Sequence, residues 1–223
     1  MIPALDEEAA IGGVVASVVG RVGRVVVADN GSTDRTAEVA RAAGAEVVRV
    51  PEPGYGRACL AGMAAVRDAE VVVFMDGDGS DDPDDLDALL APIRRGEAEF
   101  VLGSRLRGEA EAGALTLPQR FGNTLASTLM RVIWGGRFTD LGPFRALTRT
   151  ALDRLDMDAP SFGWTVQMQV RALKRGVAYV EVPVRYRRRQ AGRSKISGTV
   201  RGVVMAGSYI LGTIAREAVS RGR

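Results

Sequence analysis

Two aspartates one residue apart, Asp76 and Asp78, are the side chains of this sequence best suited to holding a metal ion. The unbroken apolar run 71–75 before them predicts a strand buried on both faces of a parallel sheet. In open α/β sheets, ligands bind beyond the carboxyl ends of the strands, so these carboxylates stand where chemistry usually occurs. A hard divalent cation prefers such oxygen ligands and also binds substrate phosphates, and Gly77 lets the backbone bend closely around it.

The same acidic stretch has a structural interpretation, because Asp and Pro also suit the start of a helix expected over residues 84–93. A calcium loop of the helix–loop–helix type is rejected. Its sixth position is Asp81 rather than Gly, its twelfth is Asp87 rather than Glu, and a strand precedes it instead of a helix. The metal site and the helix cap both remain open at this point.

The segments that must position these aspartates alternate between strand and helix patterns. In the first half we expect strands over 1–5, 25–28, 46–50, 71–75 and 100–103, with helices over 6–19, 36–43, 54–66 and 84–93. In the second half we expect helices over 119–134, 149–155, 165–175 and 198–216, and a strand over 179–184. This alternation predicts an α/β fold with a parallel sheet. The apolar stripe of the 119–134 helix is expected to face the core: Phe121, Leu125, Leu129 and Ile133.

The composition narrows the possible chemistry. The 223 residues fit one domain with a sizeable core. The absence of His excludes histidine catalysis and histidine metal ligands, and the single Cys59 excludes an internal disulfide and a CxxC site. Residues 185–201 contain many arginines and no acid. We see no signal peptide, and the uncharged stretch 202–215 is shorter than the ~20 residues that cross a bilayer, so we expect a cytoplasmic protein.

The motifs and their order resemble the family 2 glycosyltransferases of GT-A fold, and within them the dolichyl- or polyprenyl-phosphate sugar synthases. The matching segments cover almost the whole chain: 2–4 with 7–8, 29–34, 54–57, 76–78, 103–105, 139–140 with 144–145, and 189–195. The resemblance implies a Rossmann-like three-layer sandwich with a mostly parallel central sheet. It also implies a catalytic domain over 1–197, followed by a C-terminal amphipathic helix over 198–223 at the membrane interface.

The same resemblance implies roles for individual residues. Asp78, Asp76 and Ser80 would hold a Mg²⁺ or Mn²⁺ ion that bridges the diphosphate of a nucleotide-sugar. Asp140 would orient sugar hydroxyls and act with Asp76 and Asp78 in catalysis, although a helix cap or an ion pair is the plainer interpretation of Asp140. The residues implied for binding the nucleotide-sugar are Pro3, Ala4, Glu7, Asp29, Gly31, Arg57, Asp76 and Gly77.

Two positions depart from the family pattern. Asn30 stands where many relatives have a second Asp, which weakens one nucleoside ligand and leaves Asp29 in place. Gln167 stands where relatives often have Glu, so any acceptor handling by that Glu must proceed here without its charge. Neither departure removes the aspartate pair.

The protonation state of the acceptor determines which protein groups it needs. A sugar hydroxyl needs a general base when it attacks, whereas a phosphate is already ionised near neutral pH and needs cations to dock it. Arginine grips phosphate oxygens in bidentate fashion. The candidate docking groups are Arg105, Arg120, Arg145, Arg189 and Lys195, and by resemblance the first choices are Arg105, Arg120 and Arg189.

These inferences lead to one expectation and two alternatives. We expect an inverting, metal-dependent transfer of a hexose from GDP-mannose or UDP-glucose to polyprenyl or dolichyl phosphate. One alternative is the same fold acting on a soluble or cell-envelope hydroxyl acceptor, such as a sugar or glycerate derivative. The other is a non-catalytic module that binds phosphate or nucleic acid, which is disfavoured because Tyr186 is the only aromatic residue in the basic segment.

A polyprenyl phosphate lies at a bilayer surface, so the expected enzyme must work there. The helices over 120–134 and 199–214, beside the basic segment 185–195, would form an interfacial platform. Both helices could equally well complete the core. The resulting expectation is a peripheral protein on the cytoplasmic face of the membrane, with a membrane protein as a further partner and without nucleic acid.

Overall fold

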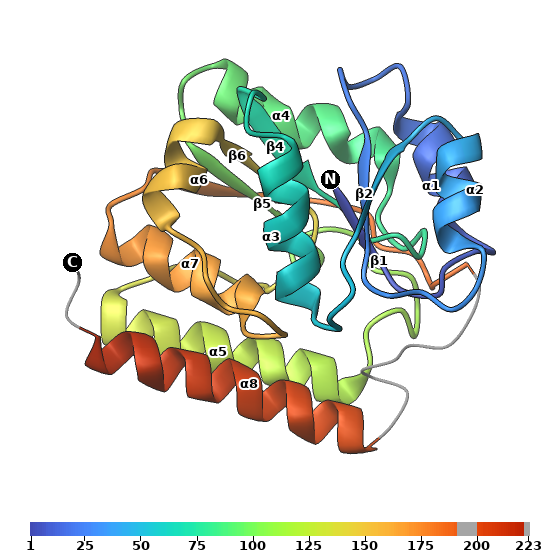
Figure 1. Cartoon of the computed structure of the whole chain (residues 1–223). Coiled ribbons are helices and arrows are strands. Elements are labelled where there is room, and N and C mark those ends of the chain that lie inside the picture. Colours follow the sequence, from blue (N-terminus) through green and yellow to red (C-terminus); the bar gives the residue numbers. More distant parts are fainter. Residues whose placement is uncertain (191–199, 221–223) are drawn as a thin grey trace.

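The computed structural model describes residues 1–190 and 200–220, so Lys195 lies outside the described residues. In the first half, strands alternate with helices in the order β1 Ile2–Ala4, α1 Ile11–Val18, β2 Val26–Asp29, α2 Thr36–Ala42, β3 Glu46–Arg49, α3 Tyr55–Ala65 and β4 Val71–Phe74. The second half continues with η1 Pro83–Asp85, α4 Leu86–Arg94, β5 Phe100–Ser104, α5 Leu117–Trp134, β6 Arg145–Thr148, α6 Arg149–Leu155, α7 Trp164–Lys174, β7 Tyr179–Pro183 and α8 Val200–Val219. Figure 1 shows their arrangement.

The strands form two sheets that meet at β1 and β4. The order is β1-β2-β3 in the first, with all pairs parallel, and β4-β6-β5-β7 in the second. The Met1 nitrogen donates to the Val73 carbonyl at 2.7 Å and its carbonyl accepts from Met75 N at 3.2 Å, as between parallel neighbours. Strand β6 runs antiparallel to both β4 and β5. The α/β sheet was therefore predicted correctly, but β6 was not expected.

Helices cover both faces of this sheet and create two hydrophobic cores. One core joins Phe100 and Leu102 of β5 to Met130, Leu152, Met168 and Ile214 on helices α5 to α8. The other core joins Val101, which points to the opposite face, to Ile11, Ala40 and Leu89 on helices α1, α2 and α4. Successive β5 side chains thus enter different cores, as the two-residue period of a strand requires. The predicted three layers are present.

Two local expectations were wrong. The acids Asp6 to Glu8 do not open a helix, since α1 begins only at Ile11. The main-chain nitrogens of Asp6, Glu7 and Glu8 instead donate hydrogen bonds to side chains of the loop after β2 and of the first residue of α2. The stripe expected to face the core on α5 does so only at Leu129, which packs against the core cluster. Phe121 is 70% exposed and Ile133 is 44% exposed, while the buried positions of α5 are Asn123, Ala126, Ser127 and Met130.

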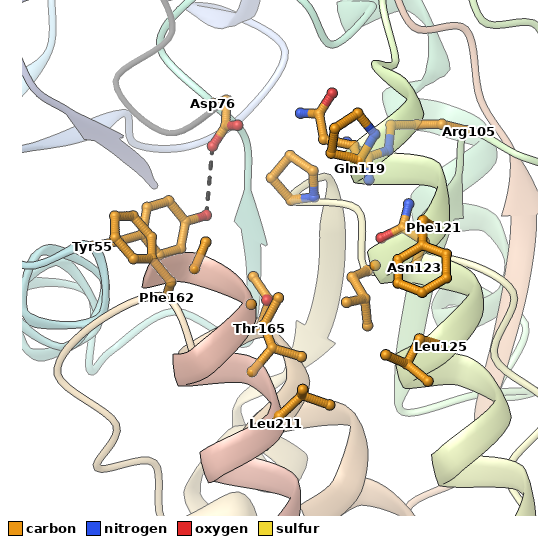
Figure 2. A pocket seen from close by; sticks show the side chains of 17 residues that line it. Tyr55, Asp76, Arg105, Gln119, Phe121, Asn123, Leu125, Phe162, Thr165 and Leu211 are labelled. Atoms are coloured by element: carbon orange, nitrogen blue, oxygen red, sulfur yellow. Dashed lines mark hydrogen bonds between the residues drawn. The ribbon is translucent and has the colours of Figure 1, made fainter. Parts of the chain in front are cut away.

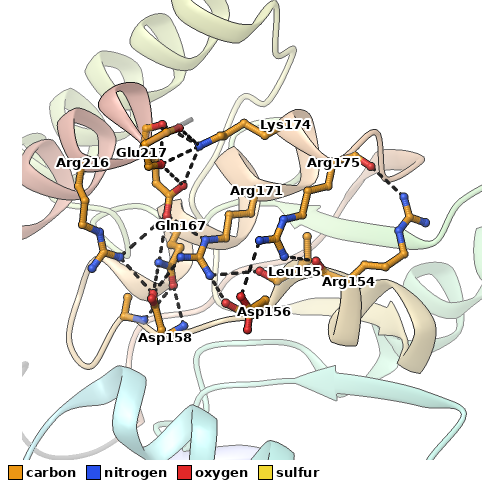
Figure 3. A network of polar contacts seen from close by, with 12 residues as sticks. Arg154, Leu155, Asp156, Asp158, Gln167, Arg171, Lys174, Arg175, Arg216 and Glu217 are labelled. Atoms are coloured by element: carbon orange, nitrogen blue, oxygen red, sulfur yellow. Dashed lines mark hydrogen bonds and ion pairs between the residues drawn. The ribbon is translucent and has the colours of Figure 1, made fainter. Parts of the chain in front are cut away.

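Helix α8 lies along α5 and α7 at one edge of the molecule (Figure 1). Gly163 allows the close approach, because a Cβ there would lie 2.0 Å from Oγ1 of Thr213. Near the other end of α8, buried Glu217 pairs with Arg171 at 2.9 Å and with Lys174 at 3.2 Å (Figure 3). Among the described residues, we find no helix whose length and apolar character would suit a membrane crossing.

Candidate active site

The carboxyl ends of β1 and β2 bring the expected nucleotide-binding residues to one edge of the sheet. The parallel register places Ala4 beside Asp29 and Pro3 beside Ala28. Asp29 is 2% exposed and its Oδ1 accepts from Ser32 N at 3.0 Å, so the chain turns tightly through Gly31, whose φ is +81°. Gly77 fits against the same corner, since a Cβ there would lie 3.4 Å from that of Ala4.

Arg57, another residue expected to bind the nucleotide-sugar, lies in the first turn of α3. Its side chain is exposed and pairs with Glu52 at 3.2 Å. Asn30, the departure noted in the sequence, uses its side-chain oxygen to accept from Gly54 N at 3.0 Å. It thereby connects the β2 loop to the turn that begins α3.

The acidic loop after β4 caps a helical turn and also carries the two aspartates of the expected metal site. Asp82 caps the following helical turn by accepting from Asp84 N at 3.1 Å, and it also pairs with Arg187 at 2.6 Å. Asp78 is buried, and its Oδ1 accepts from both the nitrogen and the hydroxyl of Ser80, at 2.9 and 2.5 Å. The Asp76 carboxylate has fewer partners. Its Oδ1 accepts from the Tyr55 hydroxyl at 3.5 Å, and its Oδ2 accepts no hydrogen bond in the described part of the chain.

The loop concentrates negative charge in a buried place. Burial, followed by the charges of Asp78 and Asp81, raises the pKa of Asp76 well above its ordinary value. Burial and Asp78 likewise raise the pKa of Asp81 to about 7. Oδ1 of Asp81 is buried and lacks a hydrogen-bond partner among the described residues. These carboxylates would be stabilised as anions by an added positive charge.

The donor set fits a divalent cation that substrate phosphates help to hold. It consists of carboxylate and hydroxyl oxygens, and an unpaired buried carboxylate oxygen is costly without a partner. No three acidic, His or Cys side chains of residues 1–190 and 200–220 are arranged to hold a metal by themselves. The protein could therefore supply only part of the coordination shell, as is usual for Mg²⁺ bound together with substrate phosphates.

Asp140 occupies a fully buried position in which both oxygens are already used. Arg105 donates to it from Nε at 2.8 Å, from Nη2 at 2.7 Å and from its main-chain nitrogen at 2.9 Å. Asn123 and Leu141 N each add a bond of 2.7 Å. Burial opposes ionisation, but the Arg105 charge and these bonds hold the pKa of Asp140 below its ordinary value. The ion-pair interpretation of Asp140 accounts for these contacts, which hold the Arg105 guanidinium in place.

A mostly apolar cavity of about 420 Å³ opens beside these charged groups. Figure 2 shows Asp76, Tyr55 and Arg105 at one end of it, and Leu125 and Leu211 toward the other. Its walls come from α5, α8 and the beginning of α7, so it depends on all three helices. Phe121 and Leu125, which failed to enter the core, line this cavity.

The structure distributes the candidate docking arginines over different surroundings. Arg105 lines the cavity, lies 4.9 Å from the centroid of the Tyr186 ring, and has no partner for its Nη1 among the described residues. Arg120 is exposed on α5, next to cavity-lining Gln119 and Phe121. Arg189 pairs with two residues that were expected to bind the nucleotide-sugar or its metal ion, namely Glu7 and, at 3.0 Å, Asp78.

Arg145 is the candidate that the structure does not bring to the cavity. Its side chain is fully buried and donates to the main-chain carbonyls of Leu141, Gly142 and Thr165. Burial lowers the pKa of Arg145 to about 10. We therefore assign Arg145 a structural role and exclude it from the proposed phosphate site.

Sequence reasoning missed Tyr55 and Asp81. Tyr55 falls within the matching segment 54–57 without a role of its own, and Asp81 served only to reject a calcium loop. Nothing in the local pattern distinguishes them from their neighbours. Their position relative to Asp76 depends on contacts between segments that the sequence alone does not place.

Comparison with known proteins adds the following findings. Residues 1–156 match the family described as Glycosyl transferase family 2. The chain is 36% identical over 208 residues to an uncharacterised glycosyltransferase of Mycobacterium tuberculosis, covering 92% of each. It is 31% identical over 211 residues to the undecaprenyl-phosphate mannosyltransferase of Micrococcus luteus, covering 89% of this chain and 86% of that one.

Among solved structures, the fold is similar to glucosyl-3-phosphoglycerate synthase from Mycobacterium tuberculosis in complex with Mn²⁺ and UDP-glucose. The TM-score is 0.78 at 26% sequence identity, and the match covers 99% of this chain and 78% of that one. The GT-A architecture expected from the sequence is thereby confirmed.

Proposed function

The chain belongs to glycosyl transferase family 2 and is a glycosyltransferase, and from this premise we propose that it transfers a hexose from a nucleotide-sugar to a polyprenyl phosphate. The observation that carries the proposal is the apolar cavity that ends at Asp76 and Arg105. Such a cavity suits an acceptor that is apolar along its chain and anionic at its reacting end.

The donor would bind at the edge formed by β1 and β2. Asp29 would accept hydrogen bonds from the base or ribose, with Pro3, Ala4 and Gly31 shaping the pocket around it. Glu7 and Arg189 form an ion pair beside the acidic loop, and Arg189 would extend positive charge toward the diphosphate. The donor diphosphate would thus lie between the nucleoside edge and Asp78.

Asp76, Asp78 and Ser80 would hold Mg²⁺ or Mn²⁺, in keeping with the Mn²⁺ in the similar glucosyl-3-phosphoglycerate synthase. When bound, the ion would neutralise charge that develops on the leaving nucleoside diphosphate. The contribution of the chain is to hold the carboxylates in place: Ser80 donates two hydrogen bonds to Oδ1 of Asp78, and the nitrogen of Asp76 donates to Oδ2 of Asp81 at 3.0 Å.

The acceptor phosphate would dock on Arg105, with Arg120 near the mouth of the cavity. Because a phosphate is ionised near neutral pH, its oxygen can attack the anomeric carbon without a general base. Attack from the side opposite the departing diphosphate inverts the anomeric centre. Asp140 would act only through Arg105, whose guanidinium plane it fixes.

The same proposal requires contact with a membrane surface, on the cytoplasmic face and at the periphery. Large apolar side chains are exposed on α5 and α8, next to the cavity: Leu117, Phe121, Val132, Ile133, Val204, Met205, Tyr209 and Leu211. An amphipathic surface of this kind suits the interface between headgroups and acyl chains. A lipid acceptor could enter the cavity from there without leaving the membrane.

Labelled donors test the proposal directly. Purified protein would be incubated with Mn²⁺, labelled UDP-glucose or GDP-mannose, and either undecaprenyl phosphate in vesicles or 3-phosphoglycerate in solution. We expect label in the lipid extract, and its loss in Asp78→Asn, which keeps the shape of the side chain and removes its charge. Protection against thermal unfolding by UDP or GDP with Mn²⁺ would identify the donor base.

A second candidate is transfer to a soluble phosphorylated acceptor. It is favoured by the similarity to glucosyl-3-phosphoglycerate synthase, whose name specifies such an acceptor. Label in 3-phosphoglycerate and none in the lipid would establish this candidate and refute ours. Nucleotide binding without transfer to either acceptor would leave the family assignment intact and reject both acceptors.

A further inference from the structure

Tyr55 lines the apolar cavity at the end where Asp76 of the acidic loop also lines it. Its hydroxyl is 3.5 Å from Oδ1 of Asp76, and both residues line the cavity (Figure 2). Its ring meets the edge of the buried Trp164 ring, with centroids 6.2 Å apart and planes at 69°. The side chain is therefore held by aromatic packing at one end and directed at a carboxylate at the other.

The turn that carries Tyr55 packs closely against the main chain of residues 159–160. A Cβ on Gly56 would lie 2.0 Å from the carbonyl oxygen of Ala159, and one on Gly54 would lie 2.4 Å from that of Pro160. Arg57 N donates to the Pro160 carbonyl at 3.1 Å. Only glycine permits this backbone contact at both positions, and Gly54 also has a φ of +154°. These two glycines thus allow the turn to dock against residues 159–160.

Residues 158–159 are themselves fixed by Gln167. Its Oε1 accepts from Asp158 N at 3.2 Å and from Ala159 N at 2.9 Å, while its Nε2 donates to Asp158 and to Glu217 (Figure 3). A continuous series of contacts therefore runs from α7 and α8 through residues 158–160 to Tyr55. Each link involves main-chain atoms or buried side chains, so the position of the phenol is closely defined.

We propose that Tyr55 is a positioning residue for Asp76. Its hydroxyl donates to Oδ1 and thereby holds the carboxylate so that Oδ2, which accepts no hydrogen bond within the described residues, would be available as a ligand to the divalent cation. The inference rests on the proposed metal-dependent transfer. Hydrogen bonds to liganding carboxylates commonly change metal affinity or activity by about 10–100-fold.

The test is Tyr55→Phe, which removes the hydroxyl and keeps the ring against Trp164. We expect kcat to fall by about tenfold while the KM for the acceptor changes less than about twofold. Mn²⁺ binding in the presence of UDP or GDP, measured by titration calorimetry, should weaken by a similar factor. This second readout needs no acceptor, so it remains informative even if the proposed polyprenyl acceptor is wrong.

Tyr179→Phe is the matched control. It also removes a tyrosine hydroxyl, one that accepts a hydrogen bond from Arg137 N at 2.9 Å, and it lies on β7 outside the cavity lining. We expect wild-type kcat and Mn²⁺ affinity in this control. Unchanged kcat and Mn²⁺ affinity in Tyr55→Phe would overturn the proposal. A rise in the acceptor KM with unchanged kcat would also overturn it, since the phenol would then contact the acceptor instead.

Discussion

At the scale of single residues, the site is defined by which carboxylates have partners. Asp140 accepts five hydrogen bonds, Asp82 caps a helical turn, and Asp78 is satisfied by Ser80 and Arg189. Asp76 and Asp81 each keep an oxygen without a partner in the described part of the chain. Acidic residues that look equivalent in the sequence therefore differ in what they can do.

We predict that Asp140→Asn damages the fold before it damages the chemistry. The substitution leaves the buried Arg105 guanidinium without its counter-charge, and breaking a buried pair typically costs about 3–5 kcal/mol. Urea unfolding should show a loss of this order, with little loss in the control Asp87→Asn, whose side chain is 87% exposed. A fully stable Asp140→Asn protein would contradict this prediction, whatever its activity.

We predict that the metal-free protein loses stability as the pH rises from about 4 to about 7. The pKa of Asp81 is raised by burial and by Asp78 from 3.8 to about 7, so folding favours its neutral form. This contribution is complete below the unfolded pKa and disappears as pH passes the folded one; the raised pKa of Asp76 acts in the same direction. Thermal unfolding should be less dependent on pH in Asp81→Asn than in the wild type or in Asp87→Asn.

At the scale of elements, α8 completes the cavity and depends on one buried carboxylate. Glu217 is 4% exposed and accepts from Gln167, Arg171 and Lys174. Burial opposes its ionisation, but these donors lower the pKa of Glu217. The contact with Glu217 explains why position 167 is Gln rather than the Glu of many relatives (Figure 3). A glutamate there would place a like charge beside Glu217 and could not donate a hydrogen bond to it.

We predict that Glu217→Gln loosens α8 while the sheet stays intact. Losing charged hydrogen bonds to Arg171 and Lys174 should cost about 2 kcal/mol. Amide hydrogen exchange should accelerate in residues 204–219, and the KM for the acceptor should rise because α8 lines the cavity. Glu97→Gln, which breaks an exposed pair with Arg95, should leave both unchanged. Uniformly faster exchange throughout the protein would mean that α8 is not a separable unit.

At the scale of the whole molecule, the two sheets support different groups of candidate site residues. The parallel strands β1 to β3 form the expected nucleotide edge, and β4 to β7 support the acidic loop and Arg105. Helices α5 and α8 lie side by side along one edge (Figure 1) and enclose the apolar cavity between them and α7. The proposed donor and acceptor sites would thus meet at Asp76.

We predict that the α5–α8 edge binds lipid. The double variant Val132→Ser and Val204→Ser changes two exposed side chains, 77% and 63% accessible, that do not line the cavity. Sedimentation with phosphatidylglycerol vesicles should fall severalfold, since membrane affinity scales with buried apolar area. Val19→Ser, 44% exposed after α1, is the control and should sediment like the wild type. Equal sedimentation of all three proteins would reject the membrane surface.

The sequence by itself determined the α/β alternation, the family and the place of the acidic loop. These features follow from local patterns, namely apolar runs, turn residues and motifs of adjacent side chains. The early strands were predicted to within about two residues, as such boundaries allow. Strand β6 was missed because its Arg145 is a charged residue buried only by contacts with distant segments.

Only the tertiary structure decided which charged groups belong to the site. Arg105 meets Asp140 across 35 residues, Arg189 meets Glu7 across 182, and Arg145 turns inward to Thr165 across 20. The pairing of a charge depends on what burial brings beside it, and burial is set by contacts between segments far apart in the chain. For the same reason Phe121 and Leu125 of the α5 stripe line a cavity: their spacing is local, but the surface opposite them is supplied by α8.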